Sequence, residues 1–423
     1  MLAQAQHTLG PSSATLAFAI VTDRRRLAVR LTADALRHVR AGHPWVYDGS
    51  IKAASHRGEA GDLAVIFDDK RNFAAIGLWD PHSPIRIRIL HKGKPTQIDD
   101  AFWRGRLETA IGHRQILRDD PDNTGIRLVN GENDQLPGLI VDQYANVLVI
   151  KLYSSAWGAH LDAITNTLQE LLQPVTIVLR LARDTARNIT APLADGQTLH
   201  GPRAPGLVWF KENGLTFGCS PATGQKTGTF LDQRDNRALV ADHSTDASVL
   251  DVFCCSGGFA VHAAAAGAKL IHTIDLSPHA IDEVATNLAA NRAVLRSDLT
   301  VESTVGDAFE AMEALVRDGR RFDIVVIDPP SFAPREAAVP MALRAYQRLT
   351  ALGLQLVNDG GLLFQASCSS RIDAEDFYAT VHLQADLAGV MLTEIERTSH
   401  ALDHRVGFVH GAYLKALLTR VNR

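Results

Sequence analysis

From residue 249 onward, short apolar runs alternate regularly with longer helix-like segments. The first run, 249–253, ends in a small-residue loop with adjacent glycines at Gly257 and Gly258, and after a helix-like segment a second run closes on Asp275. This order of strand, turn, helix, strand and acid is typical of a nucleotide-binding β-α-β unit. Adjacent glycines let the backbone approach a ligand closely. The repeat therefore predicts an α/β fold with a mostly parallel sheet.

The loop itself limits the kind of ligand. It matches neither G-x-G-x-x-G nor the G-x-x-x-x-G-K-S/T phosphate cradle, so a pyrophosphate ligand is disfavoured. Asp275 lies where a ribose hydroxyl pair can be held. An adenosyl ligand without phosphates fits better, although any doubly wound sheet with glycine in its first turn is an alternative.

The alternation predicts a seven-stranded Rossmann-like sheet whose last hairpin includes an antiparallel strand. We predict strands at 250–253, 270–274, 300–305, 322–327, 361–366, 390–396 and 412–419. We predict helices at 259–266, 278–290, 308–318, 340–357 and 373–386. Parallel strands bring their carboxyl ends to one sheet edge, so we expect the ligand there.

The motif V-L-D-V-F-C-C-S-G-G-F, with I-D-L-S about twenty residues later, resembles the first two motifs of class I S-adenosylmethionine-dependent methyltransferases. The resemblance implies S-adenosylmethionine as the cofactor. Asp275 suits the ribose, Asp307 suits the adenine amine, and Asp328 faces the transferred methyl, although each alone could be a helix N-cap. The predicted cofactor-binding residues are Phe230, Gln233, Asp251, Phe253, Ser256, Gly257, Asp275, Leu276, Asp307, Ala308 and Asp328.

Cys368, in the motif S-C-S, directly follows the predicted strand 361–366. Carbon 5 of cytosine is a poor nucleophile, but a thiolate that adds to carbon 6 makes carbon 5 enamine-like, and loss of the carbon 5 proton later expels the thiol. The motif S-C-S after this strand resembles the nucleophile motif of the RNA 5-methylcytosine enzymes, and the resemblance implies that Cys368 is this nucleophile. Asp328 would hold N3 and the 4-amino group, which requires a raised pKa or a shared proton. The alternative for a free cysteine is a buried apolar role.

Several segments together resemble the large-subunit ribosomal RNA methyltransferase I family, whose members make 5-methylcytosine. They are R-L-V-N-G-E-N-D-Q-L-P-G-L-I-V-D from Arg127, G-Q-K-T-G-T-F-L-D-Q-R from Gly224, D-P-P-S-F from Asp328, and S-C-S. In this family the segment from Gly224 lies over the cofactor. From the residues alone, we expect Asp232 to cap the helix that follows it.

The front of the chain is predicted to be a small, half-open β-barrel. Short apolar runs with Gly and Pro between them, at 63–67, 73–78 and 85–90, follow a short helix at 32–40. The segment G-H-P-W-V-Y from Gly42 resembles the start of a PUA domain, an RNA-binding module. The resemblances imply a disordered tail and three domains, at 1–22, 23–95 (PUA-like), 96–205 (central α/β) and 206–423 (methyltransferase).

Charge is distributed unevenly along the chain. Residues 21–98 carry 14 Lys and Arg against 8 Asp and Glu, whereas residues 245–423 carry 15 against 22. A basic front domain on an acidic body is compatible with ribosomal RNA as the partner, and a solvated charged face is the alternative. The candidate RNA-binding residues are Arg24, Arg25, Arg26, Lys226 and Arg371.

The cysteines and the N-terminal segment limit where the protein can act and which structural sites it can contain. The four cysteines form no C-x-x-C pair, which predicts a reducing compartment with neither a metal site nor a disulfide framework. Residues 1–20 have no basic start and no long apolar run, so neither a secretory signal nor a membrane span is expected. We expect a cytoplasmic enzyme, and the sequence is compatible with a homodimer.

Two other functions remain open. One is methylation of guanine N7 or of an exocyclic base amine in RNA, which needs no thiol. Enzymes of the exocyclic-amine type use D-P-P followed at once by an aromatic residue, whereas here Phe332 comes one place later. The other is a non-catalytic RNA-binding assembly factor that has kept a cofactor pocket.

Overall fold

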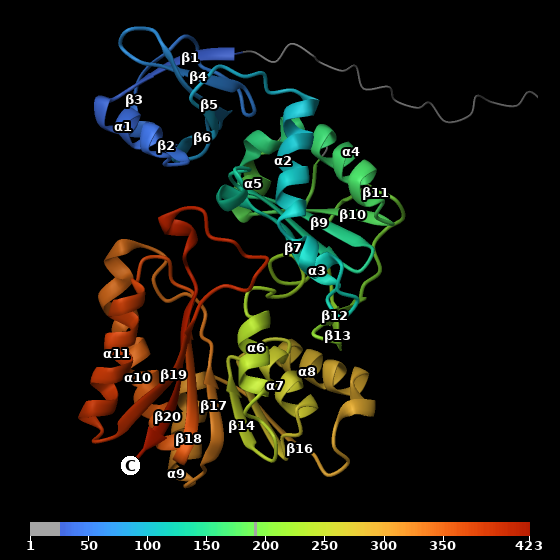
Figure 1. The fold of residues 1–423 in the computed structure, drawn as a ribbon, viewed down its shortest axis with the longest axis vertical. Coiled ribbons are helices and arrows are strands. Elements are labelled where there is room, and N and C mark those ends of the chain that lie inside the picture. The colour runs from blue at the N-terminus through green and yellow to red at the C-terminus, as the bar shows by residue number, and fades with distance from the viewer. Residues whose placement is uncertain (1–25, 190–192) are drawn as a thin grey trace, which may run out of the picture.

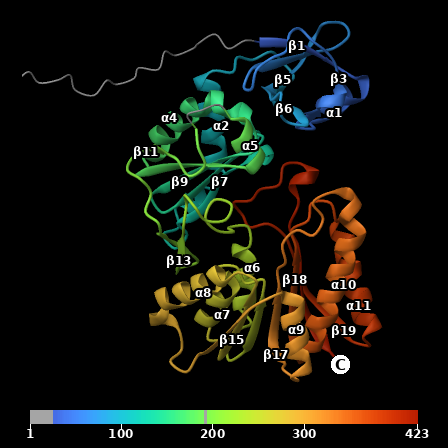
Figure 2. The same cartoon turned by 180° about the vertical axis from the view of Figure 1, so that it is seen from behind.

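The computed structural model describes residues 26–189 and 193–423, which form three sheets and one separate hairpin (Figure 1 and Figure 2). The predicted tail at 1–22 and the candidate residues Arg24 and Arg25 lie outside the described residues. Within the described part, no helix is both long and apolar enough to cross a membrane.

The C-terminal sheet has seven strands in the order β16-β15-β14-β17-β18-β20-β19. Five strands are parallel, and β20 is antiparallel to both of its neighbours, which confirms the predicted Rossmann-like sheet and its last hairpin. The strands are β14 Ser248–Val252, β15 Leu270–Asp275, β16 Thr300–Val305, β17 Phe322–Ile327, β18 Val357–Ser367, β19 Met391–Thr398 and β20 Lys415–Asn422. The helices are α6 Arg234–Ala241, α7 Gly258–Ala265, α8 Pro278–Ala290, α9 Ala308–Arg317, α10 Val339–Leu356 and α11 Ala374–Leu387.

Alternate residues of these strands enter two different cores. Val249 and Phe364 pack with α7 and α8 on one face, whereas Leu250 and Leu363 pack with α9, α10 and α11 on the other. A strand points successive side chains to opposite faces, so apolar runs without polar alternation become strands buried on both sides. The layered arrangement leaves the carboxyl ends of the parallel strands as the edge where polar residues gather.

The front domain is a six-stranded sheet in the order β2-β6-β5-β4-β1-β3. Its elements are β1 Arg26–Leu31, α1 Ala33–Ala41, β2 Trp45–Tyr47, β3 Ile51–Ala54, β4 Leu63–Phe67, β5 Phe73–Trp79 and β6 Ile85–Lys92. The two edge strands, β2 and β3, are joined by the single 3-10 turn η1 Asp48–Ser50, so the sheet curls back on itself as the predicted half-open barrel requires. Both were missed because three or four residues carry too little periodicity.

The middle sheet has five strands in the order β11-β10-β9-β8-β7. Three of these strands lie between residues 125 and 152. The elements are α2 Asp100–Gly112, α3 Gln115–Arg118, β7 Gly125–Asn130, η2 Gly131–Asp134, β8 Leu139–Tyr144, β9 Val147–Leu152, η3 Ser155–His160, α4 Leu161–Leu172, β10 Thr176–Leu181, α5 Arg183–Asn188 and β11 Thr198–His200. The core of this sheet continues into the front domain through Leu63, Ile76 and Leu90.

Two segments join the middle sheet to the C-terminal sheet. The hairpin of β12 (Val208–Glu212) and β13 (Leu215–Cys219) packs Phe210 against Tyr144 of β8. The β19–β20 connection, residues 399–414, rises in red between the other domains in Figure 1. There Asp403, fully buried, accepts two hydrogen bonds from the Arg234 guanidinium, and its carbonyl accepts two from Arg114. The ion pair lies within the C-terminal domain, and the hydrogen bonds from Arg114 join its β19–β20 connection to the middle domain.

Candidate active site

The carboxyl ends of β14, β15, β16, β17 and β18 bring the predicted functional residues to one edge of the sheet. The loop after β14, residues 253–257, is here called the β14 loop, and residues 367–370 after β18 are called the β18 loop. Asp275 ends β15, while Asp328 follows β17 directly. The sequence order of the repeat is therefore sufficient to gather these groups.

The β14 loop has an unusual backbone. Phe253, Cys255 and Gly257 all have left-handed conformations, with φ of 63°, 49° and 78°. A Cβ on Gly257 would also lie 2.9 Å from Val284 Cγ2. Residues with side chains rarely adopt such φ values, and they cluster at ligand sites where the surroundings hold them in place.

Two carboxylates organise the backbone around this loop. Asp275 accepts hydrogen bonds from Cys255 N at 3.0 Å and from Ser277 N at 2.9 Å. Asp251 accepts one from Ala260 N at 3.1 Å, while its other oxygen, Oδ1, is buried without a partner among the described residues. Burial raises the pKa of Asp251 to about 7. An unpaired buried carboxylate oxygen calls for a donor, such as the ammonium group of a ligand.

The remaining predicted cofactor residues differ in exposure. Asp307 is the N-cap of α9 and accepts from Phe309 N and Glu310 N, so its helix-capping role is realised. Ala308 beside it is buried, whereas the Leu276 side chain is 73% exposed at the same edge. The Ser256 hydroxyl lies 3.4 Å from that of Thr229, which joins the β14 loop to the segment from Gly224.

The segment 224–233 lies beside this edge and is fixed by the middle sheet. The Thr227 hydroxyl donates to Asp142 Oδ2 at 2.6 Å and lies 3.2 Å from the Tyr144 hydroxyl. Lys226, exposed and left-handed at φ 51°, places its ammonium 3.9 Å from the centre of the Phe230 ring. A β-strand pair of the middle domain thus holds Lys226 toward the catalytic edge.

Asp232 does not cap the following helix, which corrects our prediction. Helix α6 has Gln233 at its N-cap, without a side-chain cap, and Asp232 instead accepts the Tyr413 hydroxyl at 2.7 Å. Burial alone would raise the pKa of Asp232, but Lys226, His404 and the Tyr413 hydrogen bond together hold it well below its usual range. Asp232 is therefore a fixed negative charge.

Asp328, like Asp251, is an acid with a raised pKa. Burial, and then the charge of Asp232, raise the pKa of Asp328 to about 7, while a hydrogen bond from Gln233 acts in the opposite direction. Near neutral pH the carboxyl group is consequently divided between its two protonation states. This matches the prediction that Asp328 would need a raised pKa.

Cys368 is half-buried, and its thiol donates to the Pro329 carbonyl at 3.7 Å, which places it against the segment that carries Asp328. Burial, and then Asp328, raise the pKa of Cys368 to about 11, against the opposing effects of Lys226 and Lys415. Ser367 and Ser369 on either side are fully buried. The thiol therefore lies at the surface of the core. It is neither fully buried, as a purely apolar role would require, nor fully exposed.

Two residues of this site escaped the sequence analysis, Tyr413 and Lys415. Tyr413 lies near the end of the β19–β20 connection and Lys415 begins β20, and both fall within the strand predicted at 412–419. Lys415 is buried and donates to the carbonyls of Ser369 and Tyr413. A lysine inside an apolar strand is rarely buried without a partner, and that was the available signal.

Of the other cysteines, Cys219 and Cys254 are buried, whereas Cys255, like Phe332, is half-buried. Cys254 is buried, and burial raises the pKa of the Cys254 thiol well above its usual value. The Phe332 ring lies 5.3 Å from that of Tyr346, in the cluster between α10 and α11. In the described part of the chain, no three His, Cys, Asp or Glu side chains are grouped to hold a metal ion.

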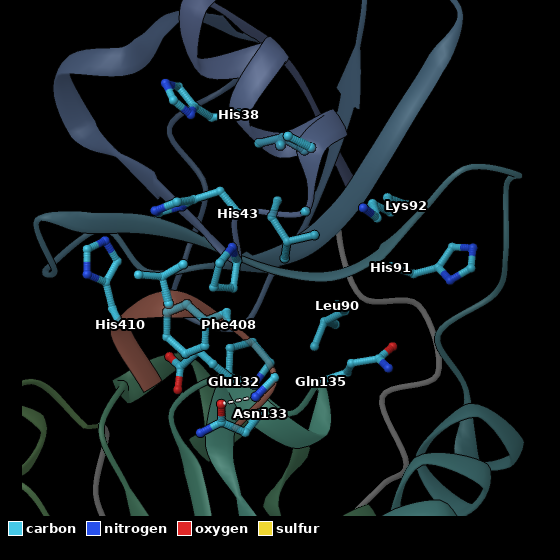
Figure 3. Close-up of a pocket in the computed structure, with 18 of the residues that line it drawn as sticks. His38, His43, Leu90, His91, Lys92, Glu132, Asn133, Gln135, Phe408 and His410 are labelled. Carbon is cyan, nitrogen blue, oxygen red and sulfur yellow. Dashed lines mark hydrogen bonds between the residues drawn. The ribbon is translucent and has the colours of Figure 1, made fainter. Parts of the chain in front are cut away.

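A cavity of about 1060 Å³ lies where the front domain, the middle domain and the β19–β20 connection meet. In Figure 3, His43 and His410 lie on one side of this cavity, with Lys92 and His91 on the other. The His410 ring stacks on Trp45 of β2 with ring centres 6.1 Å apart. This basic and aromatic lining suits a nucleic acid more than an apolar ligand.

The candidate RNA-binding residues of the described part are exposed but lie apart. Arg26 begins β1 in the front domain, while Lys226 and Arg371 border the catalytic edge. The Arg371 guanidinium is 4.0 Å from Glu336 Oε2, a loose pair between exposed groups. Arg371 is therefore free to meet a phosphate, and only the last two of these residues lie near Cys368.

Comparison with protein families gives two matches along the chain. Residues 29–92 match the family described as PUA-like domain, and residues 127–399 match the family described as S-adenosylmethionine-dependent methyltransferase. The second match includes the β14 loop, the segment 224–233 and the β18 loop.

Curated relatives match over nearly the whole chain. The ribosomal RNA large subunit methyltransferase of Deinococcus radiodurans is 41% identical over 94% of this chain and 98% of its own length. The ribosomal RNA large subunit methyltransferase I of Shewanella amazonensis is 36% identical over 90% and 95%. Among solved structures, a Streptococcus mutans protein provisionally assigned as a SAM-dependent methyltransferase has a TM-score of 0.79 over 93% of this chain and 99% of that one. It is 19% identical, so it shows the fold alone.

Proposed function

Because the chain belongs to the S-adenosylmethionine-dependent methyltransferase family, and within it to the large-subunit ribosomal RNA methyltransferases, we propose that it methylates carbon 5 of a cytosine in large-subunit ribosomal RNA. The observation that carries this proposal is the position of Cys368. Its thiol contacts the Pro329 carbonyl, beside an acid whose pKa is raised to about 7. Methylation of a base nitrogen would need no thiol there.

The cofactor of the family is S-adenosylmethionine, which supplies an electrophilic methyl group on a sulfonium sulfur. The residues in and around the β14 loop fit this cofactor. The unpartnered Oδ1 of Asp251 would accept a hydrogen bond from its ammonium group, and Asp275 would hold the ribose hydroxyls. Asp307 and Ala308 would bind the adenine, and Phe230, Gln233, Phe253, Ser256, Gly257, Leu276 and Asp328 would complete the site.

Cys368 in the β18 loop and Asp328 after β17 would carry out the chemistry on the base. The Cys368 thiolate forms a bond to carbon 6 while Asp328 donates a proton to N3, which leaves carbon 5 with enamine character. After methylation, a base removes the proton from carbon 5. The electrons of that C–H bond re-form the C5–C6 double bond and expel the thiolate, and N3 returns its proton.

RNA is the proposed substrate because the active edge and the front domain together offer an extended contact surface. Lys226 and Arg371 would neutralise phosphates near the target, and the cavity that Figure 3 shows would hold part of the same RNA. The Cys368 thiol is half-buried, so the cytosine would have to be unpaired or flipped out of a helix.

The test uses the full chain with labelled S-adenosylmethionine and unmodified large-subunit ribosomal RNA, followed by mass-spectrometric identification of the methylated nucleoside. We expect 5-methylcytosine from the wild type and none from Cys368→Ala, while cofactor binding by the variant is retained. A methylated guanine or adenine, or cytosine methylation unaffected by Cys368→Ala, would overturn the proposal.

A further inference from the structure

Lys415 is a buried cation next to the β18 loop. It begins β20 and pairs with Ser367 of β18, the residue before Cys368. The side chain is 3% exposed, and its ammonium donates to the Ser369 carbonyl and, at 3.2 Å, to the Tyr413 carbonyl. Lys415 thus contacts the backbone on both sides of Cys368, at Ser367 and Ser369. Because it is buried, a bound substrate would not contact its side chain directly.

No carboxylate lies within ion-pair distance of Lys415 among the residues that the structure describes. Burying an ammonium without a counter-charge is unfavourable, and burial lowers the pKa of Lys415 to about 8. Two backbone carbonyls accept from two of its three N–H donors but leave the charge itself uncompensated. An apolar residue at this position would therefore cost the protein no stability, unless an anion forms near the ammonium.

The ionisable groups that face Lys415 are few. They are Cys368 in the β18 loop, Asp373 before α11, and His400 and Tyr413 on the β19–β20 connection. Burial lowers the pKa of His400 to about 4, and burial raises the pKa of Tyr413 well above its usual value, so both are uncharged near neutral pH. Asp373 is exposed and screened by water. Cys368 is the remaining group that can become a buried anion.

We propose that Lys415 is a positioning residue whose ammonium stabilises the Cys368 thiolate from inside the protein while it holds the β18 loop through the Ser369 carbonyl. This rests on the proposed role of Cys368 as the nucleophile. An opposite charge near a thiol favours its ionised form. The charges that face Cys368 are then Lys415 from β20 and Lys226 from segment 224–233, against Asp328 and Asp232.

The experiment measures the rate at which iodoacetamide alkylates Cys368 in the full-length protein between pH 6.5 and 10, with Cys368 followed by peptide mass spectrometry. Neither cofactor nor RNA is added. We expect Lys415→Met to slow alkylation of Cys368 about tenfold at pH 8, as loss of one nearby opposite charge predicts. Lys415→Arg should stay close to the wild type at that pH. Lys211→Met, which removes an exposed lysine of β12, is the control for loss of one charge elsewhere.

Lys415→Arg gives an independent reading that does not depend on the folding of Lys415→Met. Burial brings the pKa of Lys415 to about 8, whereas arginine stays charged, so the ratio of Lys415→Arg to wild-type alkylation should rise above that pH. An unchanged rate in folded Lys415→Met, or a ratio that stays flat up to pH 10, would overturn the inference. The nucleoside analysis of Cys368→Ala reports separately on the proposed function, so the two failures are distinguishable.

Discussion

Cys255 in the β14 loop and Cys368 in the β18 loop lie at the same edge of one sheet, and their surroundings differ. Both thiols are half-buried, and burial raises the pKa of each to about 11. Two carboxylates and one cation act on Cys255, namely Asp275, Glu283 and Arg237. Two carboxylates and two cations act on Cys368, namely Asp328, Asp232, Lys226 and Lys415. Equal pKa values in the ligand-free protein therefore do not identify the nucleophile. The number of nearby cations separates the two thiols.

The backbones of the two loops differ as well. The β14 loop has three left-handed residues, and none of residues 367–370, all of which the structure describes, has a left-handed φ. Hydroxyl groups support the β18 loop instead, with Ser331 and Ser369 hydroxyls 3.0 Å apart. A strained backbone suits close approach of main-chain atoms to a ligand, and a relaxed, braced one suits presentation of a side chain. The comparison predicts cofactor binding at the first loop and covalent chemistry at the second.

The largest expected effect separates the two thiols directly. RNA that contains 5-fluorocytidine should trap the covalent adduct, because fluorine at carbon 5 cannot leave as a proton. Cys368→Ala should lower the yield of denaturation-resistant adduct by on the order of 1000-fold or more, as expected when a nucleophile is removed. The yield is measured on a denaturing gel with labelled RNA.

Cys255→Ala is the matched variant in the other loop. It should still form the adduct, reduced severalfold at most through weaker cofactor binding. Loss of the adduct in Cys255→Ala with retention in Cys368→Ala would reverse the assignment of the two loops.

A second prediction concerns the strained backbone of the β14 loop. Gly257→Ala places a Cβ at φ 78° and 2.9 Å from Val284 Cγ2. Forcing a side chain into the left-handed region costs about 1–2 kcal/mol, so affinity for S-adenosylhomocysteine should fall roughly tenfold by calorimetry. The rate of Cys368 alkylation should not change, because the β18 loop is untouched.

Gly105→Ala provides the control for this substitution, since Gly105 lies in α2 with open space around its missing Cβ and an ordinary φ. A cofactor affinity equal to that of the wild type in Gly257→Ala would show that the left-handed backbone is not needed for binding.

The sequence was informative about this edge because local rules decide it. The strands at 300–305 and 322–327 were predicted to the residue, since each is an uninterrupted β-prone run between polar segments. For the same reason the acids at strand ends were identifiable as a set. Strand β18 begins at Val357, four residues before its predicted start, and passes through N-D-G-G at 358–361 with a shifted register.

The sequence was uninformative where distant segments decide the contacts. Asp232 was expected to cap a helix, yet its carboxylate accepts a hydrogen bond from the hydroxyl of Tyr413, 181 residues away. Asp403 joins Arg114 across 289 residues from a connection that has no periodicity. Lys415 begins β20 directly after that connection, and only the packed structure shows that its ammonium contacts the β18 loop.

A third prediction uses the raised pKa of Asp251. Because its folded-state pKa of about 7 exceeds the ordinary 3.8, ionisation opposes folding, and the free energy of unfolding of the ligand-free protein should fall as pH rises from 3.8 to about 7. Asp251→Asn should therefore be the more heat-stable protein at pH 8, by a few degrees in Tm, provided that the amide keeps the Ala260 hydrogen bond.

Cofactor affinity should change with pH in the opposite direction, because the proposed ligand of the cofactor ammonium is the ionised Asp251. Wild-type affinity should increase up to about tenfold between pH 6 and pH 8, as the ionised fraction increases. In Asp251→Asn the affinity should be low and independent of pH across that range. A pH-dependent affinity that survives the substitution would assign the titration to another group.

The smallest expected effect tests whether the β18 loop is the side that meets RNA. Arg371 directly follows this loop, and its guanidinium is only loosely paired with Glu336. Arg371→Gln should weaken RNA binding a few-fold and lower the slope of log affinity against log salt by about one, as loss of one phosphate contact predicts. Arg317 is an exposed residue of α9, and Arg317→Gln should change neither quantity. Both variants should bind S-adenosylhomocysteine as the wild type does. If Arg371→Gln leaves the salt slope unchanged, the RNA does not pass Arg371, and the basic residues that guide it to Cys368 are those of segment 224–233 and the front domain.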